Sequence, residues 1–291
     1  MTKKKSLILT GATGFLGSRL LRSLIQEGYK VSILKRSQSN TERIEDLLPL
    51  VRSFDLDRDT LSSVFQEEPI HSIIHTATIY GTGESISEVF STNTSFPLDL
   101  LESGLKHGIR HFINTDTSLP SDLSPYAASK KQFAKWGRTL AEKHRVDFSN
   151  ILLEHMYGPG ENPSRLPSFL INSCLKNVKS IPLTPGKQKR DFIYIDDVIR
   201  AFLLIVENDL GSGEFPLGSG IPVSVKEFAT LIKEKTQSDT TLDFSALPYR
   251  SGELMHSQAD TSKLNSLGWN CLYSLEEGLR KSIKHCQKEY C

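Results

Sequence analysis

Tyr126 and Lys130 are four positions apart in the stretch Ser-Pro-Tyr-Ala-Ala-Ser-Lys at 124–130. Pro125 suits the first turn of a helix, and residues four apart share a helix face with Cβ atoms roughly 5–6 Å apart. A free phenol has a pKa of about 10, too high for acid–base work near neutral pH. A neighbouring ammonium lowers that pKa. We therefore predict a catalytic Tyr126–Lys130 pair, with an ordinary surface pair as the alternative.

A hydroxyl-rich segment, Thr-Asp-Thr-Ser at 115–118, follows a predicted strand at 111–114. The Thr117 hydroxyl is predicted to hold a substrate carbonyl beside the phenol of Tyr126. Thr115 and Ser118 are the alternatives, because only nine positions separate Thr117 from Tyr126.

A glycine turn near the start of the chain predicts a phosphate site. The apolar run 7–9 is typical of a strand buried on both faces, and Gly11, Gly14 and Gly17 follow it. Apolar residues then recur at helical spacing until Gly28. Glycines let the backbone approach a pyrophosphate, and the helix N-terminus offers unpaired N–H groups. The alternative is an ordinary strand-to-helix turn.

The residues after a second predicted strand, 30–34, indicate the type of coenzyme. An NAD site usually has Asp or Glu there, whereas this chain has Lys35 and Arg36, with Ser37 and Ser39 close by. A guanidinium suits a 2′-phosphate through charge-assisted bonds. The prediction is NADPH, with a solvated basic strand end as the alternative.

Two further strand ends are predicted to approach the coenzyme. Strand 50–54 ends at Asp55-Leu56, where the carboxylate either bonds the adenine amino group or caps a helix starting near Asp57. Strand 70–75 ends at His75, which we expect to be packed, and small residues at 76–78 follow.

A helix predicted over 86–107, interrupted near Pro97, carries Asn93. A buried Asn in a helix needs a partner. Asn93 therefore either holds backbone or water near the active site, or is exposed and idle.

The bulk composition is that of an ordinary globular chain. The net charge of +1 does not predict a nucleic-acid partner. The apolar run after Lys3-Lys4-Lys5 is too short for a signal peptide, and no stretch is long enough to cross a membrane. Cys174, Cys271, Cys286 and Cys291 lack metal-type spacing. We expect reduced thiols, no metal and a cytoplasmic location.

These residues resemble the extended short-chain dehydrogenase/reductase family. The similar motifs are Thr-Gly-Ala-Thr-Gly-Phe-Leu-Gly at 10–17, Tyr126-x-x-x-Lys130, Tyr-Gly-Pro-Gly at 157–160 and Arg-Asp-Phe-Ile-Tyr-Ile-Asp-Asp at 190–197. Arg-Ser-Gly-Glu at 250–253 and Leu-Gly-Trp at 267–269 continue the pattern.

The resemblance implies an α/β fold with a doubly wound parallel (Rossmann) sheet over 1–155. A smaller C-terminal substrate lobe is expected over 156–291, with segments near 190–206 packing back on the first domain. The coenzyme-binding set so implied is Gly11, Thr13, Gly14, Phe15, Leu16, Gly17, Lys35, Arg36, Asp55, Leu56, Thr76, Ala77, Thr78, Asn93, Tyr126 and Lys130.

The distal half is expected to bind the substrate. A sixth strand is predicted over 146–153, and Glu154 and His155 follow at its carboxyl end, where open α/β sheets bind ligands. His155 either bonds the substrate or is simply packed. By resemblance, Arg190 and Arg250 match positions that contact a nucleotide diphosphate, with surface ion pairs as the alternative.

The structural elements of this half are also predicted. Helices are expected at 166–177 and 198–207, with a short strand at 192–195 before the second of them. Asp196 and Asp197 are read as first-turn carboxylates and not as catalysts. Two capping boxes, Ser224-x-x-Glu227 and Ser274-x-x-Glu277, predict two more helices.

A narrower resemblance is to CDP-abequose and CDP-paratose synthases, in the stretches 112–120, 153–160, 188–192 and 252–257. It implies NADPH-dependent reduction of the C4 keto group of a CDP-3,6-dideoxy-4-ketohexose, a step toward bacterial O-antigen sugars. The alternatives are a dTDP-4-keto-6-deoxyhexose reductase, an NAD-dependent nucleotide-sugar 4-epimerase or dehydratase, and a non-catalytic NADP-binding sensor. The family's habit further implies a homodimer through the helices at 86–107 and 126–145.

Overall fold

The computed structural model describes residues 5–66, 68–208 and 210–289. Lys3, Lys4 and Cys291, for which we made sequence predictions, lie outside these ranges. The chain divides into two compact units, the first made of residues 1–152 and 202–215 and the second of residues 153–201 and 216–291.

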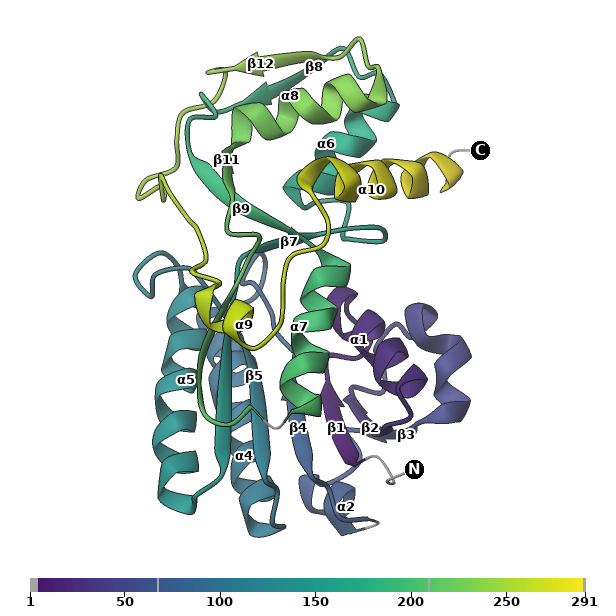
Figure 1. The fold of residues 1–291 in the computed structure, drawn as a ribbon, viewed down its shortest axis with the longest axis vertical. Helices are drawn as coiled ribbons and strands as arrows, with labels where there is room; N and C mark the ends of the chain where they lie inside the picture. The colour runs from purple at the N-terminus through teal and green to yellow at the C-terminus, as the bar shows by residue number, and fades with distance from the viewer. Residues whose placement is uncertain (1–4, 67, 209, 290–291) are drawn as a thin grey trace. The chain divides into compact units, whose positions relative to one another are not determined.

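The first unit is built on a seven-stranded sheet, and the predicted α/β class is confirmed (Figure 1). The strand order is β10-β6-β5-β4-β1-β2-β3. Strand β1 pairs in parallel with β2 and with β4, and the pairs β2–β3 and β4–β5 are also parallel. The strands are β1 (Ser6–Thr10), β2 (Lys30–Lys35), β3 (Arg52–Asp55), β4 (Ser72–His75), β5 (His111–Thr117), β6 (Asp147–Leu153) and β10 (Gly213–Leu217).

Helices alternate with these strands, as a doubly wound sheet requires. They are α1 (Phe15–Gln26), the 3₁₀ helix η1 (Glu42–Leu50), α2 (Leu61–Gln66), α3 (Ile86–Phe90), the π-helix η2 (Ser91–Ser95), α4 (Phe96–Lys106) and α5 (Pro125–His144). Helix α7 (Ile195–Glu207) contributes its part from Phe202 onward to this unit.

Two local predictions for this unit are corrected, and one helix was missed. Helix α2 begins at Leu61 and not near Asp57, because the Asp59 carboxylate bonds the backbone N–H of Asp55 in an intervening turn. The predicted strand 111–114 is three residues too short, since β5 runs to Thr117. Helix η1 was not predicted.

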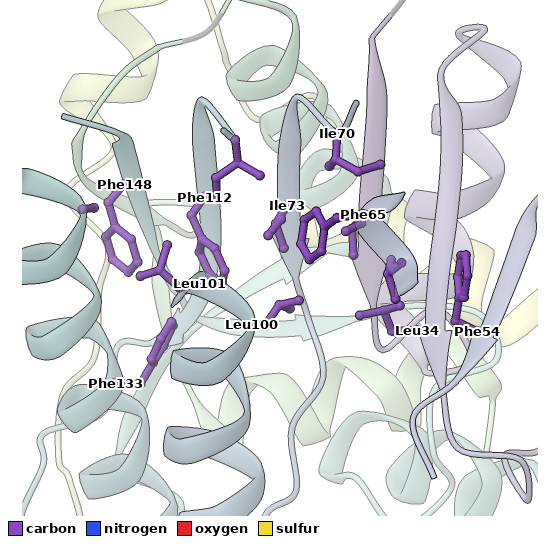
Figure 2. Close-up of a cluster of buried hydrophobic side chains, with 14 residues drawn as sticks. Leu34, Phe54, Phe65, Ile70, Ile73, Leu100, Leu101, Phe112, Phe133 and Phe148 are labelled. Atoms are coloured by element: carbon purple, nitrogen blue, oxygen red, sulfur yellow. The ribbon is translucent and has the colours of Figure 1, made fainter. Parts of the chain in front are cut away.

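The core of the first unit lies between the sheet and its helices. Figure 2 shows Leu101 of α4 among Phe112, Phe148 and Phe133 of α5, and Leu100 of α4 near Ile73. The rings of Phe112 and Phe148 stack with centroids 5.7 Å apart. This packing fixes α4 and α5 against β4, β5 and β6, whose ends carry predicted site residues. The cluster is Ile8, Leu34, Phe54, Val64, Phe65, Ile70, Ile73, Leu100, Leu101, Ile109, Phe112, Phe133, Ala141 and Phe148.

The second unit contains two small sheets. One has the order β11-β9-β7, with β7 parallel and β11 antiparallel to β9, and the other pairs β12 with β8 in parallel. The strands are β7 (His155–Tyr157), β8 (Ser180–Leu183), β9 (Lys189–Tyr194), β11 (Pro222–Ser224) and β12 (Thr241–Phe244). The helices are α6 (Leu166–Leu175), α8 (Val225–Thr236), α9 (Ser262–Ser266) and α10 (Leu275–Glu289), with the start of α7.

The predicted capping boxes are present at α8 and α10, where Ser224 and Ser274 exchange hydrogen bonds with Glu227 and Glu277. The strand predicted over 192–195 instead starts at Lys189, so Arg190 lies within β9. In the described part of the chain, no helix has the length and apolar character needed to span a membrane.

Two buried aspartates hold the loops of the second unit. Asp191 accepts hydrogen bonds from the backbone N–H groups of Ser219, Gly220 and Ala259. Asp197 lies in the first turn of α7, as predicted, and accepts from the N–H groups of residues 272 and 273. Backbone donors occupy both carboxylates, which makes them structural.

Candidate functional site

The glycine turn between β1 and α1 forms the predicted cradle. Gly11 has φ +70°, and a Cβ there would lie 2.6 Å from the Ala77 nitrogen. A Cβ on Gly17 would overlap the Gly11 carbonyl. Gly14 is the N-cap of α1 and makes no side-chain cap, so no side chain competes for the first N–H groups of the helix. This backbone fits the pyrophosphate of a dinucleotide.

Thr10, which the sequence analysis missed, ties the ends of β1 and β4 together. Its hydroxyl oxygen accepts from the N–H groups of Thr76 and Ala77, both at 3.2 Å, and lies 2.8 Å from Nδ1 of His75. Because two backbone donors occupy this oxygen, its proton goes to Nδ1 and leaves His75 protonated on Nε2. Thr10 thereby fixes the loop that passes beneath the glycine turn.

His75 is packed, as expected. It is fully buried, and burial together with the charge of Lys130 holds its pKa well below the usual value. Three aromatic rings surround the imidazole, those of Phe96, Phe112 and Phe133.

Asn93 lies in the π-helix η2 and is fully buried. Its side-chain oxygen accepts from Thr78 Oγ1 and from the N–H of Ile79, both at 3.0 Å. Its amide donates to the Ile79 carbonyl at 2.8 Å and to Ser129 Oγ at 3.1 Å. Of the two alternatives, the buried one holds: Asn93 joins the loop after β4 to α5, one residue before Lys130. The π-turn that carries it is the interruption expected near Pro97.

Lys35 and Arg36, the two basic residues predicted to select the coenzyme, lie at the end of β2 in different surroundings. Lys35 forms an ion pair with Asp55 at the end of β3. Helix α2 begins at Leu61, too far along the chain for Asp55 to cap it. The Leu56 N–H bonds the Lys35 carbonyl at 2.8 Å. Arg36 is exposed, and in the described ranges its guanidinium has no ion-pair partner. At this strand end, Arg36 is therefore the basic side chain exposed to solvent.

Tyr126 and Lys130 occupy the first two turns of α5. Ser124 caps this helix by accepting from the Ala127 N–H at 3.2 Å. The ring of Tyr126 lies against that of Tyr80, with centroids 4.9 Å apart and planes at 33°. The sequence analysis missed this neighbour, because the loop after β4 carries no pattern that pairs it with α5.

Lys130 is 2% exposed, and burial lowers its pKa to about 8. The negative charge of Asp116 opposes that fall, while the positive charge of Lys131 adds to it. A lysine with this pKa keeps its charge at neutral pH and loses it under mildly alkaline conditions.

Thr117 is the last residue of β5 and is 5% exposed. Its hydroxyl oxygen accepts from the Leu119 N–H at 3.2 Å, which leaves the hydroxyl proton for a substrate oxygen. Thr115, two residues earlier on the same face of the strand, has a buried hydroxyl that makes no hydrogen bond within the described ranges. The position of Thr117 at the strand end favours it.

The three predicted substrate residues of the second unit differ in their surroundings. His155 lies 3.4 Å from the buried carboxylate of Glu154, which also accepts from Ser257. Arg190 is 9% exposed and forms an ion pair with Glu253, and burial lowers its pKa. Arg250 is exposed. Of these three residues, Arg250 is the cation exposed to solvent.

Comparison with known proteins identifies the family. The model of the NAD dependent epimerase/dehydratase family matches residues 7–218. The chain belongs to this family. It is 35% identical to the CDP-abequose synthase of Salmonella muenchen, over 96% of this chain and 97% of that protein. It is 30% identical to the CDP-abequose synthase of Salmonella typhimurium, with 97% and 98% covered.

Solved structures of other proteins share the fold of this chain. The UDP-glucose 4-epimerase of Thermotoga maritima with UDP-glucose matches with a TM-score of 0.86 and 24% identity, over 98% of this chain and all of that chain. The UDP-glucuronic acid 4-epimerase of Bacillus cereus, in complex with UDP-glucuronic acid and NAD, matches with a TM-score of 0.87 and 24% identity, again over 98% and 100%.

Proposed function

We propose that this protein is an NADPH-dependent reductase of the C4 keto group of a CDP-linked 3,6-dideoxy-4-ketohexose. The observation that carries the proposal is the placement of Tyr126 and Lys130 on α5 next to the end of β5, where Thr117 lies. The near full-length similarity to two CDP-abequose synthases supports the choice of substrate.

The chain's own residues supply the acid and the orientation. In the proposed reaction, Thr117 donates a hydrogen bond to the C4 carbonyl oxygen and Tyr126 gives that oxygen its phenolic proton. Lys130, charged at neutral pH, stabilises the phenolate until it regains a proton from solvent. NADPH, when bound, supplies the hydride that C4 accepts, so that a ketone becomes a secondary alcohol.

The coenzyme assignment depends on two regions of the first unit. The cradle of Gly11, Gly14 and Gly17 fits the pyrophosphate, since a Cβ at Gly11 or Gly17 would meet backbone. Arg36 would hold the 2′-phosphate by charge-assisted bonds. Loss of NADPH preference in Arg36→Asp would support this assignment.

We assign the substrate diphosphate to Arg190 and Arg250, and a sugar hydroxyl or phosphate oxygen to His155. Arg190 already has Glu253 as its partner, so a diphosphate must compete with that carboxylate. Arg250→Gln should therefore raise the substrate KM more cleanly than Arg190→Gln, which also leaves Glu253 unpaired.

The test is a substrate panel with NADPH: the CDP-3,6-dideoxy-4-ketohexose, a dTDP-6-deoxy-4-ketohexose and UDP-glucose. We expect the coenzyme to be consumed with the CDP sugar, and the C4 proton coupling of the product to give its configuration by NMR. An axial C4 hydroxyl means abequose and an equatorial one paratose. Consumption only with the dTDP sugar would overturn the proposed substrate.

A nucleotide-sugar 4-epimerase is the second candidate, because the structures most similar in fold include epimerases in complex with NAD. An epimerase of this kind retains its coenzyme through the cycle. Tightly bound NAD in the purified protein, with interconversion of UDP-glucose and UDP-galactose, would favour this candidate over the reductase.

We also propose a cytoplasmic homodimer that forms through α3–α4 and α5. A groove of about 480 Å³ between α4 and α5 is lined by Leu98, Leu140 and Trp136, and Trp136 is 53% exposed. Trp136→Glu should convert a dimer to a monomer in sedimentation velocity. Sedimentation of the unmodified protein as a monomer at micromolar concentration would contradict the dimer.

A further inference from the structure

Asp116 and Lys131 form an ion pair behind the proposed catalytic residues, and neither belongs to the predicted site. Asp116 Oδ2 lies 3.2 Å from Lys131 Nζ, and the Asp116 side chain is fully buried while that of Lys131 is 30% exposed. A buried carboxylate costs free energy unless it is paired and hydrogen-bonded. Such a pair at this strand end therefore needs an explanation.

The pair holds both backbone polar groups of Thr117. Asp116 Oδ1 accepts from the Thr117 N–H at 2.7 Å, and Lys131 Nζ donates to the Thr117 carbonyl. Lys131 is on α5, one residue after Lys130, so this bond ties the end of β5 to the helix of Tyr126 and Lys130.

Two asparagines complete the support. Asn150 of β6 donates to Asp116 Oδ2 at 2.9 Å and accepts from Asn114 at 2.7 Å. The partners come from β5, β6 and α5, and all of them lie in the first unit. The arrangement fixes the carboxylate, and through it the backbone that carries the Thr117 hydroxyl.

We propose that Asp116 and Lys131 are positioning residues for Thr117, and that this ion pair, one residue from Lys130 on α5, sets the pH range in which the site works. The inference rests on the proposed function, in which Thr117 orients the substrate carbonyl. A mainly structural ion pair would stabilise the fold without changing the pH range of catalysis.

The charges around Lys130 give the test its direction. Asp116 on β5 raises the pKa of Lys130, and Lys131 on α5 lowers it. Two further titratable groups lie close to Lys130: Tyr126, one turn earlier on α5, and His75 on β4, which burial keeps neutral. Neither neighbour is changed in the test variants.

The experiment measures kcat/KM against pH for Asp116→Asn, Lys131→Met and Lys131→Arg in the full-length protein. We expect the alkaline limb to move to lower pH in Asp116→Asn and to higher pH in Lys131→Met, each by about 0.5–1 pH unit. Both should lose roughly tenfold in plateau kcat through a misplaced hydroxyl. Lys131→Arg keeps the charge and the donors, so it should restore the limb and most of kcat.

The matched control is the ion pair of Arg138 and Glu214. This pair lines a cavity of about 330 Å³ that Asp116 and Lys131 also line. Its nitrogen and oxygen lie 2.6 Å apart, and both side chains are about half exposed. Arg138→Gln should leave the pH profile unchanged.

Unshifted limbs, or limbs that move in the same direction in the two variants, would overturn the inference. If Lys131→Met does not fold, the nearly isosteric Asp116→Asn and the Lys131→Arg variant still decide the matter. Failure of the proposed function is recognised separately, by full activity in Tyr126→Phe.

Discussion

Two strand ends of the first unit are assigned to the proposed chemistry, and their charged side chains differ in burial and pairing. At the end of β5, Asp116 is fully buried and Lys130 is 2% exposed. At the end of β2, Lys35 and Asp55 have side chains 14% and 24% exposed, and Arg36 is open to solvent. The first end is organised before any ligand arrives, as acid–base catalysis requires. The second leaves Arg36 exposed, which is the cation that we propose binds the 2′-phosphate of NADPH.

The strongest way to break this comparison is Tyr126→Phe, which removes the proton donor from the organised end. We expect kcat to fall by about 10²–10⁴-fold, with the NADPH Kd changed less than about threefold, because the cradle is untouched. Steady-state kinetics and fluorescence titration measure the two quantities. The matched control is Tyr80→Phe, which keeps the ring that lies against Tyr126 and should retain most of the turnover.

The glycine turn separates folding from coenzyme binding. Gly17→Ala brings a Cβ into the Gly11 carbonyl, so it should cost about 3 kcal/mol or more in the free energy of unfolding. Gly14→Ala meets that same carbonyl at 3.3 Å and should cost less than about 1 kcal/mol while weakening NADPH binding. Urea unfolding and coenzyme titration distinguish the two variants. Equal stability of both would show that the turn is less tight than described.

Arg36→Gln tests the open strand end. The variant should lower the ratio of kcat/KM for NADPH over NADH by about 10–100-fold, because it removes a charge-assisted phosphate contact. Lys35→Gln should change that ratio less, since Lys35 is already paired with Asp55. The opposite order of effects would mean that Lys35 leaves Asp55 to bind the phosphate.

The burial of Lys130 should also make both activity and stability depend on pH. The folded-state pKa of Lys130 is about 8, below the 10.5 of a free lysine, so its charge is lost as pH rises through 8. The value of kcat/KM should then fall about tenfold per pH unit above pH 8. Between pH 8 and 10.5 the unfolded chain binds this proton and the folded chain does not. The contribution of Lys130 to the free energy of unfolding therefore rises with pH in that window. Above pH 8, kcat/KM should therefore fall while the free energy of unfolding gains from Lys130. Urea unfolding of Lys130→Met should not show this gain.

Local patterns were sufficient for much of the fold. The glycine turn, the Tyr126 helix and both capping boxes were predicted because each depends on residues within a few positions of one another. The start of α2 was missed because an aspartate turn, made by Asp59 on Asp55, precedes it.

The support of the site could not be predicted in the same way. Asn150 is 34 positions from Asp116, and Thr10 is 65 from His75. Polar residues carry no sequence signal that names a distant partner. Asn93 was predicted in part. The sequence indicated that a buried Asn needs hydrogen-bond partners, but it did not identify those partners.

The most direct test of the central claim is a single-turnover reaction of the CDP-3,6-dideoxy-4-ketohexose with NADPH that carries deuterium at both hydrogens of nicotinamide C4. The account predicts one deuterium at sugar C4 for each NADPH oxidised, detected by NMR as loss of the C4 proton signal. No coenzyme oxidation, or a C4 alcohol formed without deuterium, would contradict hydride transfer from NADPH by this protein.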